Sequence, residues 1–307
     1  MDKVIRIGTR DSELALWQAN FVKAKLETLG FKTQLVPVKS TGDLVLDKPL
    51  YELGITGIFT KTLDVAMLKG EVDIAVHSLK DVPTLLPKGI TQGAVLPRAT
   101  VYDILVHKGN LDFLHAEGTI ATGSLRRKAQ WLHRHASHRV ENLRGNVNTR
   151  LQKLEEHAWD GAIFAAAGLE RIGLLPEHHI TLDWMIPAPA QGAMMVAVLE
   201  DDSFCRKAIS ELNHPQTVLC TTIEREFLRT LEGGCTAPIG AIASIHEDTL
   251  YFKGVLFSLN GKHKVMVERE VPVQKAMGMG KTCAEEVLQN GGMEIMKTIK
   301  AELSAAK

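Results

Sequence analysis

The chain has 307 residues, of which 45% are hydrophobic and 23% are charged. These proportions are ordinary for soluble globular proteins and exclude disordered, collagen-like and coiled-coil chains. Lys plus Arg and Asp plus Glu both number 36, whereas a sequence-independent nucleic-acid binder carries an excess of positive charge. The length fits two or three domains.

The first hundred residues alternate strand-like and helical patterns. Strands are expected at 4–8, 35–38 and 73–77, with helices at about 12–29 and 60–68. This order predicts a doubly wound, mostly parallel α/β sheet.

The same alternation restarts near Arg98, which predicts a second α/β lobe and a cleft between the two. The expected strands are 104–107, 119–122, 140–143 and 161–165, and the expected helices are 124–135 and 146–157. A further apolar strand, 193–199, is expected to return to the first lobe, so that two crossovers join the lobes.

The last third of the chain has a different pattern. A long helix at 217–231 precedes three strand-like segments and a final helix at about 281–303, and Asn260-Gly261 is a strong hairpin signal. This pattern predicts a small α+β domain with a three-stranded antiparallel sheet. We therefore expect three domains, which comprise residues 1–97 with 193–212, residues 98–192, and residues 213–307.

Six of the fourteen arginines lie between positions 126 and 150. Arginine binds carboxylates and phosphates bidentately and keeps its charge. Two strand-to-helix turns carry four of these arginines, and ligands of open α/β sheets bind at the carboxyl ends of strands. The sequence therefore predicts an anion site at these turns, whose residues are Thr122, Ser124, Arg126, Arg127, Arg144 and Arg150. Arg134 and Arg139 are expected on a solvated helix face.

Two further segments carry candidate reactive groups. Asp81, in the loop that follows the third strand, is either a general acid or base or a turn cap ahead of Pro83. Cys235 follows two glycines in a loop, where it is either an exposed nucleophile or attachment point, or a small buried hydrophobe.

Other signals argue against metals, disulfides and export. His133, His135 and His138 have no acidic partner at ligand spacing, so no metal site is expected. The four cysteines lie far apart, and no targeting segment is visible at the N-terminus. These features predict a protein of the reducing cytoplasm.

Five segments, in order along the chain, resemble the porphobilinogen deaminase family. They are Ile7-Gly8-Thr9-Arg10-Asp11-Ser12 with the helix after it, His77-Ser78-Leu79-Lys80-Asp81-Val82-Pro83, Gly123-Ser124-Leu125-Arg126-Arg127, Leu143-Arg144-Gly145-Asn146-Val147-Asn148-Thr149-Arg150, and Glu232-Gly233-Gly234-Cys235.

The resemblance implies a transferase, hydroxymethylbilane synthase, that acts in porphyrin and haem biosynthesis. It joins four porphobilinogen molecules head to tail into the linear tetrapyrrole hydroxymethylbilane and releases four ammonias. It also implies a covalent dipyrromethane cofactor on Cys235, and two lobes like those of type II periplasmic binding proteins. We expect a cytoplasmic monomer whose product passes to downstream tetrapyrrole enzymes, with no nucleic-acid or membrane partner.

The resemblance also assigns roles to residues. Asp81 is the expected catalytic carboxylate, which assists loss of ammonia and stabilises the resulting azafulvene cation. The expected cofactor-binding residues are Cys235, Ser78, Lys80, Asp81, Thr122, Ser124, Arg126, Arg127 and Arg144. The expected substrate-binding residues are Arg10, Ser12, Arg144, Arg150, Arg171 and Gln191.

Among the positions that depart from the family pattern, Thr56 stands where many members carry a lysine and Gly123 where a serine is common. Each removes one possible polar contact. A different reading of the chain is a two-lobed solute- or anion-binding protein without catalysis, but such a protein needs neither Asp81 nor a reactive cysteine.

Overall fold

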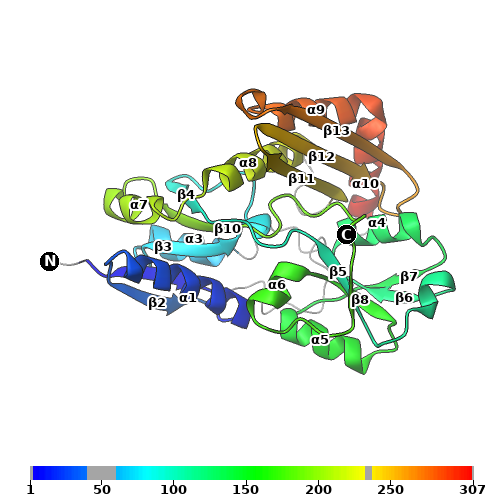
Figure 1. The fold of residues 1–307 in the computed structure, drawn as a ribbon, viewed down its shortest axis with the longest axis horizontal. Helices are drawn as coiled ribbons and strands as arrows, with labels where there is room; N and C mark the ends of the chain where they lie inside the picture. Colours follow the sequence, from blue (N-terminus) through cyan, green and yellow to red (C-terminus); the bar gives the residue numbers. More distant parts are fainter. Residues whose placement is uncertain (1–2, 40–59, 232–236, 306–307) are drawn as a thin grey trace.

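A computed structural model of the chain describes residues 3–39, 60–231 and 237–305. Within these ranges the strands form two five-stranded sheets and one three-stranded sheet. The first two sheets carry helices and form two lobes, and the third belongs to a smaller unit beside both of them (Figure 1). The arrangement confirms the predicted class of two α/β lobes with an α+β domain.

The first lobe contains a sheet with the strand order β2-β1-β3-β10-β4. Its strands are β1 (Ile5–Thr9), β2 (Thr33–Pro37), β3 (Ile74–Ser78), β4 (Ile90–Val95) and β10 (Met194–Leu199). Its helices are α1 (Glu13–Thr28), α3 (Lys61–Leu68) and α7 (Ser203–Ser210). Helix α1 buries Ala19, Val22 and Leu26 against this sheet, at the three- and four-residue spacing of one helix face.

The second lobe has the strand order β7-β6-β8-β5-β9. Its strands are β5 (Asp103–His107), β6 (Thr119–Ala121), β7 (Arg139–Glu141), β8 (Gly161–Ala165) and β9 (His179–Thr181). Its helices are α4 (Leu125–Arg134), α5 (Val147–Glu156) and α6 (Ala166–Arg171). Strands β4 and β9 and helices α6 and α7 were not expected from the sequence.

The expectation of mostly parallel sheets was wrong, because each lobe contains two parallel and two antiparallel pairings. In the first lobe β10 runs antiparallel to both β3 and β4, and in the second lobe β5 runs antiparallel to both β8 and β9. These are the strands that follow the two crossovers. A chain that crosses at the carboxyl ends of the parallel strands enters the next sheet from that end and must run in the opposite direction.

The third unit packs helices against one face of an antiparallel sheet. Its elements are α8 (Pro215–Thr230), β11 (Ile239–His246), β12 (Thr249–Phe257), β13 (Lys264–Pro272), α9 (Met279–Val287) and α10 (Met293–Ala305). Ile223 and Phe227 of α8 are fully buried and belong to one core with Phe252 of the sheet. Gly261 has a φ of 73° in the connection between β12 and β13, a conformation that glycine adopts without steric cost.

The prediction of a single final helix at about 281–303 was also wrong. A wider turn over Leu288–Gly292 separates α9 from α10. Gly291 adopts a φ of 102°, which breaks the right-handed helix at a position where glycine has no steric penalty.

Glu224 of α8 joins the third unit to both crossovers. Its buried carboxylate accepts hydrogen bonds from Arg98 Nη1 at 2.6 Å and from the backbone N–H groups of Ala190 at 2.6 Å and Ala243 at 2.7 Å. Arg98 and Ala190 lie in the outgoing and returning crossovers. One carboxylate therefore holds the two connections and the third sheet together, while the domain boundaries drawn from the sequence stay a prediction.

Candidate functional site

The loop after β3 holds Asp81 at the surface of a small pocket. A 3-10 turn, Leu79–Asp81, follows the strand directly, and buried Leu79 and Val82 anchor the loop on either side of Lys80 and Asp81. The Asp81 side chain stays partly exposed. The local sequence thus buries its apolar residues and leaves the carboxylate facing the pocket.

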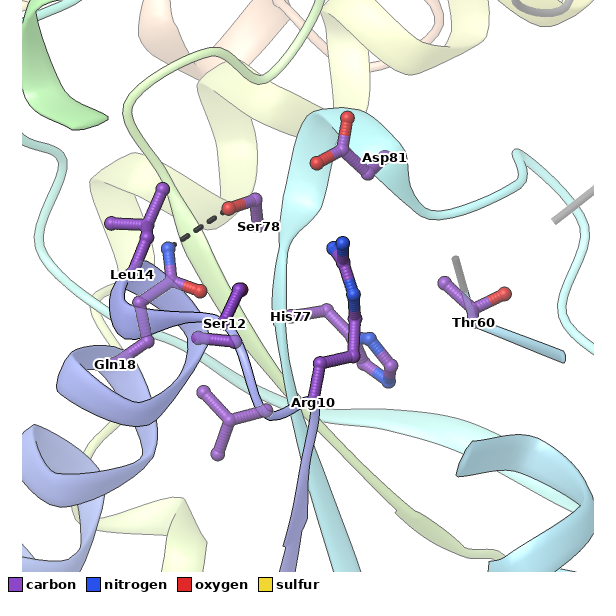
Figure 2. A pocket seen from close by; sticks show the side chains of 10 residues that line it. Arg10, Ser12, Leu14, Gln18, Thr60, His77, Ser78 and Asp81 are labelled. Atoms are coloured by element: carbon purple, nitrogen blue, oxygen red, sulfur yellow. Dashed lines mark hydrogen bonds between the residues drawn. The ribbon is translucent and has the colours of Figure 1, made fainter. Parts of the chain in front are cut away.

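Figure 2 shows how the pocket is built around this carboxylate. Arg10 extends from the end of β1 toward Asp81, with Ser12 on one side and Thr60 on the other. Ser12 occupies the N-cap position of α1, but its hydroxyl caps no N–H group within the described chain. Ser78 lines the same pocket and its Oγ accepts a hydrogen bond from Gln18 Nε2 at 2.9 Å.

The pocket contains a histidine that is neutral at pH 7. His77 is buried, and burial together with the neighbouring Arg10 lowers its pKa to about 4. The positive charge on this wall of the pocket therefore comes from Arg10 and not from the imidazole.

In the second lobe, Asp103 binds both arginines of the first predicted anion turn. Arg126 Nη1 lies 2.7 Å from Asp103 Oδ2, and Arg127 Nη2 lies 2.7 Å from Asp103 Oδ1. The Asp103 side chain is fully buried and both guanidiniums hold its pKa far below the usual range. One carboxylate thus compensates part of the charge of two buried cations.

The turn before α4 has the predicted arrangement of hydroxyls. Ser124 is the N-cap residue and its Oγ accepts from Arg127 N at 3.4 Å, while buried Thr122 accepts from Ser124 N at 3.3 Å. A Cβ at Gly123 would lie 2.5 Å from the Leu143 carbonyl oxygen. The glycine thus allows the two predicted anion turns to approach each other. The other position that departs from the family pattern, Thr56, lies outside the described residues.

The second turn adds Arg144 and Arg150 to the same group of cations. Asn146 caps α5 by accepting from Thr149 N at 2.9 Å, and Arg150 Nε donates to Gly145 O at 2.7 Å. Burial, followed by repulsion from Arg127 and Arg144, lowers the pKa of Arg150 to about 10, although Asp81 opposes the change. Repulsion among neighbouring guanidiniums indicates a site with more positive charge than its own carboxylates neutralise.

Charges from both lobes meet at Lys80. Burial lowers the pKa of Lys80 to about 8, and Arg127 and Arg126 act in the same direction, whereas Asp81 and Asp103 oppose the change. The structure therefore brings the loop of the first lobe and the arginine turns of the second into one electrostatic environment. Arg134 and Arg139 both lie exposed, as expected, but Arg139 belongs to strand β7 and not to a helix face.

Arg171 and Gln191 lie beside the returning crossover. Arg171 Nη2 donates to Gly192 O at 2.7 Å, and its guanidinium lies 5.8 Å from the ring of Trp17 in α1. Gln191 is fully buried and its side chain bonds to protein groups of both lobes. Their predicted role in substrate binding stays a prediction.

Cys235 lies outside the described residues, between α8 and β11. The other three cysteines, Cys205, Cys220 and Cys283, are all buried. Burial raises their pKa values to about 12, 11 and 11 respectively, so these thiols are poor nucleophiles at neutral pH.

Sequence reasoning missed three residues that organise this region. Asp103 and Glu224 are buried acids inside otherwise apolar patterns, and an acid in such a pattern is the signal that was available. Arg225 of α8 donates to the carbonyl oxygens of Val82 at 2.8 Å and Pro83 at 2.6 Å, directly after Asp81. No local pattern distinguishes Arg225 from a surface arginine.

The described ranges of the chain lack two kinds of feature. No group of three or more His, Cys, Asp or Glu side chains is placed to hold a metal ion there. None of the helices there is both long enough and apolar enough to cross a membrane.

The fold and the site define a two-lobed α/β protein in which lysine and arginine side chains lie near the Asp81 carboxylate. A third unit is held to the crossovers between the lobes. The profile described as "Porphobilinogen deaminase, dipyromethane cofactor binding domain" matches residues 5–207, and "Porphobilinogen deaminase, C-terminal domain" matches residues 218–289. The chain belongs to the porphobilinogen deaminase family.

Curated relatives match nearly the full length. The porphobilinogen deaminase of Pelotomaculum thermopropionicum is 41% identical, over 98% of this chain and 99% of the relative. That of Geotalea uraniireducens is 39% identical, over 99% of this chain and 98% of the relative. Among solved structures, the methionine-binding protein MetQ is similar with a TM-score of 0.46 and 12% identity, over 68% of this chain and 89% of that one.

Proposed function

We propose that this chain is a hydroxymethylbilane synthase of the tetrapyrrole pathway. Four porphobilinogen molecules and one water give hydroxymethylbilane and four ammonias. The observation that carries the proposal is the meeting of Asp81 with cations from both lobes, in a chain of this family. Each porphobilinogen ring carries two carboxylates, so a growing chain is a polyanion that needs such a group of cations.

The residues present fit the dipyrromethane cofactor named in the family profile. Two pyrrole rings carry several carboxylates, and the mutual repulsion of Arg127, Arg144 and Arg150 is relieved when anions lie among them. When bound, the cofactor supplies the terminal pyrrole carbon to which the first substrate ring is joined. We propose that Ser78, Lys80 and Asp81 from the first lobe hold it, together with Thr122, Ser124, Arg126, Arg127 and Arg144 from the second.

Asp81 has the chemistry that the substrate requires. Loss of ammonia leaves an electron-poor pyrrole with partial positive charge, which a nearby carboxylate stabilises. After the carbon–carbon bond forms, the pyrrole carbon must lose a proton, and the Asp81 carboxylate accepts it. Arg10, Ser12, Arg144, Arg150 and Arg171 bind the carboxylates of the incoming and growing chain, and Gln191 takes part through its contact with Lys80.

The attachment point of the cofactor is Cys235, by motif match and because the other three thiols are buried. Intact-protein and peptide mass spectrometry of the purified chain, with a porphobilinogen turnover assay, tests this assignment. We expect an adduct of two pyrroles on the Cys235 peptide, which Cys235→Ser removes. Cys205→Ser, Cys220→Ser and Cys283→Ser should keep it. An active protein whose Cys235 peptide is unmodified would contradict the proposal.

Localisation, oligomeric state and partners are part of the same proposal. The chain works in the cytoplasm as a monomer and passes its product to downstream tetrapyrrole enzymes, without nucleic-acid or membrane partners. The balance of 36 basic and 36 acidic side chains supports a small-molecule role. Analytical ultracentrifugation of the cofactor-loaded protein tests the monomer assignment.

A further inference from the structure

The side chain of Gln191 connects the two lobes at the cleft. Its Oε1 accepts a hydrogen bond from Lys80 Nζ at 3.2 Å, and its Nε2 donates to Val101 O at 2.7 Å and to Asp103 Oδ1 at 3.0 Å. Both amide hydrogens are therefore donated to protein oxygens. A side chain with this set of contacts is committed to holding protein groups and is poorly suited to bind a substrate carboxylate directly.

An amide is the chemical group that suits this position. It accepts from a cation with its oxygen and donates to a carboxylate with its nitrogen, without adding charge to a buried site. A carboxylate here would face Asp103, and an apolar side chain would leave the Lys80 ammonium and the Val101 carbonyl without these bonds.

The bridge continues into the arginine turns. Asp103 binds Gln191 through Oδ1 and also binds Arg126 and Arg127. A continuous set of polar contacts thus runs from Lys80 of the first lobe, through the returning crossover, to two guanidiniums of the second. The backbone of Gln191 is also held, because its carbonyl accepts from Arg98 Nε at 2.8 Å.

We propose that Gln191 is a positioning residue, which holds the Lys80 ammonium beside Asp103 so that cations of both lobes act on the same bound carboxylate. The hydrogen bonds of Gln191 stand on the structure alone. Their effect on a bound carboxylate rests on the proposed function. The charged groups that act on Lys80 are Asp81, Asp103, Arg126 and Arg127. Without the acceptor at Gln191, one stabilising contact of the ammonium is lost and the repulsion by Arg126 and Arg127 is less compensated.

The test compares two substitutions at Gln191 with one matched control. Gln191→Met keeps the length of the side chain and removes the bridge. Gln191→Glu keeps an acceptor for Lys80, but it loses the bonds donated to Val101 and Asp103 and places a second carboxylate beside Asp103, so it isolates the Lys80 contact from the rest of the bridge. Gln130→Met is the control, because Gln130 is a buried amide of the second lobe that bonds to Ile186 N and O, both at 2.8 Å, and not to Lys80.

The first measurement is the pKa of Lys80, obtained from the pH dependence of its acetylation by acetic anhydride and read by peptide mass spectrometry. We expect a decrease of about one pH unit in Gln191→Met and an increase in Gln191→Glu, since a hydrogen bond to a charged form favours that form. Gln130→Met should leave the value unchanged even if its melting temperature falls.

The second measurement is the pH profile of kcat/KM for porphobilinogen in the cofactor-loaded proteins. We expect KM to rise about tenfold in Gln191→Met, as for loss of a hydrogen bond to a charged group, with a smaller change in kcat and partial rescue in Gln191→Glu. If the Lys80 pKa and the profile are the same in Gln191→Met and Gln130→Met, the residue is structural only and the proposal is overturned. If the Lys80 pKa moves as expected but even the native chain turns over no porphobilinogen, the bridge stands and the proposed function fails.

Discussion

The two lobes supply two walls of the candidate site, and these walls hold their charges in different ways. In the first lobe, Asp81 and Arg10 line a pocket on a loop and at a strand end, and the Asp81 carboxylate is partly exposed. In the second lobe, Arg126 and Arg127 are buried and paired with a fully buried carboxylate, Asp103. The charges of the first wall lie at a partly exposed surface, whereas those of the second wall are part of the core of their lobe.

This difference predicts that stability and activity separate in the first lobe and are coupled in the second. Removing one partner of a buried ion pair leaves an uncompensated charge, while changing a partly exposed carboxylate does not. Four substitutions test the comparison.

The largest effect is expected on stability in the second lobe. Asp103→Asn leaves the Arg126 and Arg127 guanidiniums buried without their carboxylate, which should cost about 3–5 kcal/mol of unfolding free energy. Urea unfolding followed by circular dichroism measures it. Asp81→Asn serves as the control and should change stability by less than about 0.5 kcal/mol. Equal losses in both variants would remove the distinction between the two walls.

Asp81→Asn should produce the largest selective effect on catalysis. The substitution keeps the shape of the side chain and removes the charge that stabilises the substrate cation and accepts its proton. Turnover should fall about a hundred-fold or more, while cofactor assembly persists at least in part. Steady-state assays on protein whose cofactor content is verified by intact mass measure this. Near-normal turnover in folded, loaded protein would identify Asp81 as a turn cap.

A smaller loss of anion binding is expected when Arg150 is replaced. Its guanidinium lies near Arg127 and Arg144 but forms no ion pair with Asp103. Arg150→Gln should weaken binding of the anionic chain about ten- to a hundred-fold, as for loss of one buried charge-assisted contact. Mass spectrometry that counts the substrate units on the enzyme, together with KM, reports the stalled step. Arg134→Gln and Arg139→Gln are exposed controls, and equal small effects at all three would favour a solvated cationic face.

The smallest effect is a pH dependence that has opposite signs for binding and for stability. Because the pKa of Lys80 is lowered from 10.5 to about 8, its charge is lost above pH 8 and anion binding should weaken there. The unfolded chain keeps this proton up to about pH 10.5, so the contribution of Lys80 to unfolding free energy rises with pH between these values. Lys80→Arg should keep binding constant across this range. A native chain whose anion affinity is flat from pH 7 to 9.5 would contradict the assignment.

The sequence by itself determined the helices, strands and turns that depend on interactions between neighbouring residues. Apolar spacing identified most helices and strands, Asn260-Gly261 identified a hairpin, and the arginines at two strand ends indicated the group of cations that the structure brings together. These inferences succeed because periodicity and turn chemistry act over a few neighbouring residues. The local pattern also placed Asp81 correctly in the loop after a buried strand, while its catalytic role stays a prediction.

Only the tertiary structure decided the contacts between distant segments. Asp103 and Arg126 are 23 positions apart, and Lys80 and Gln191 are 111 positions apart. The antiparallel direction of β5 and β10 depends on where the chain crosses between lobes, and the role of Glu224 depends on three segments meeting at one carboxylate. Such contacts follow from the packing of whole elements, because a buried charge is stable only where distant partners converge on it.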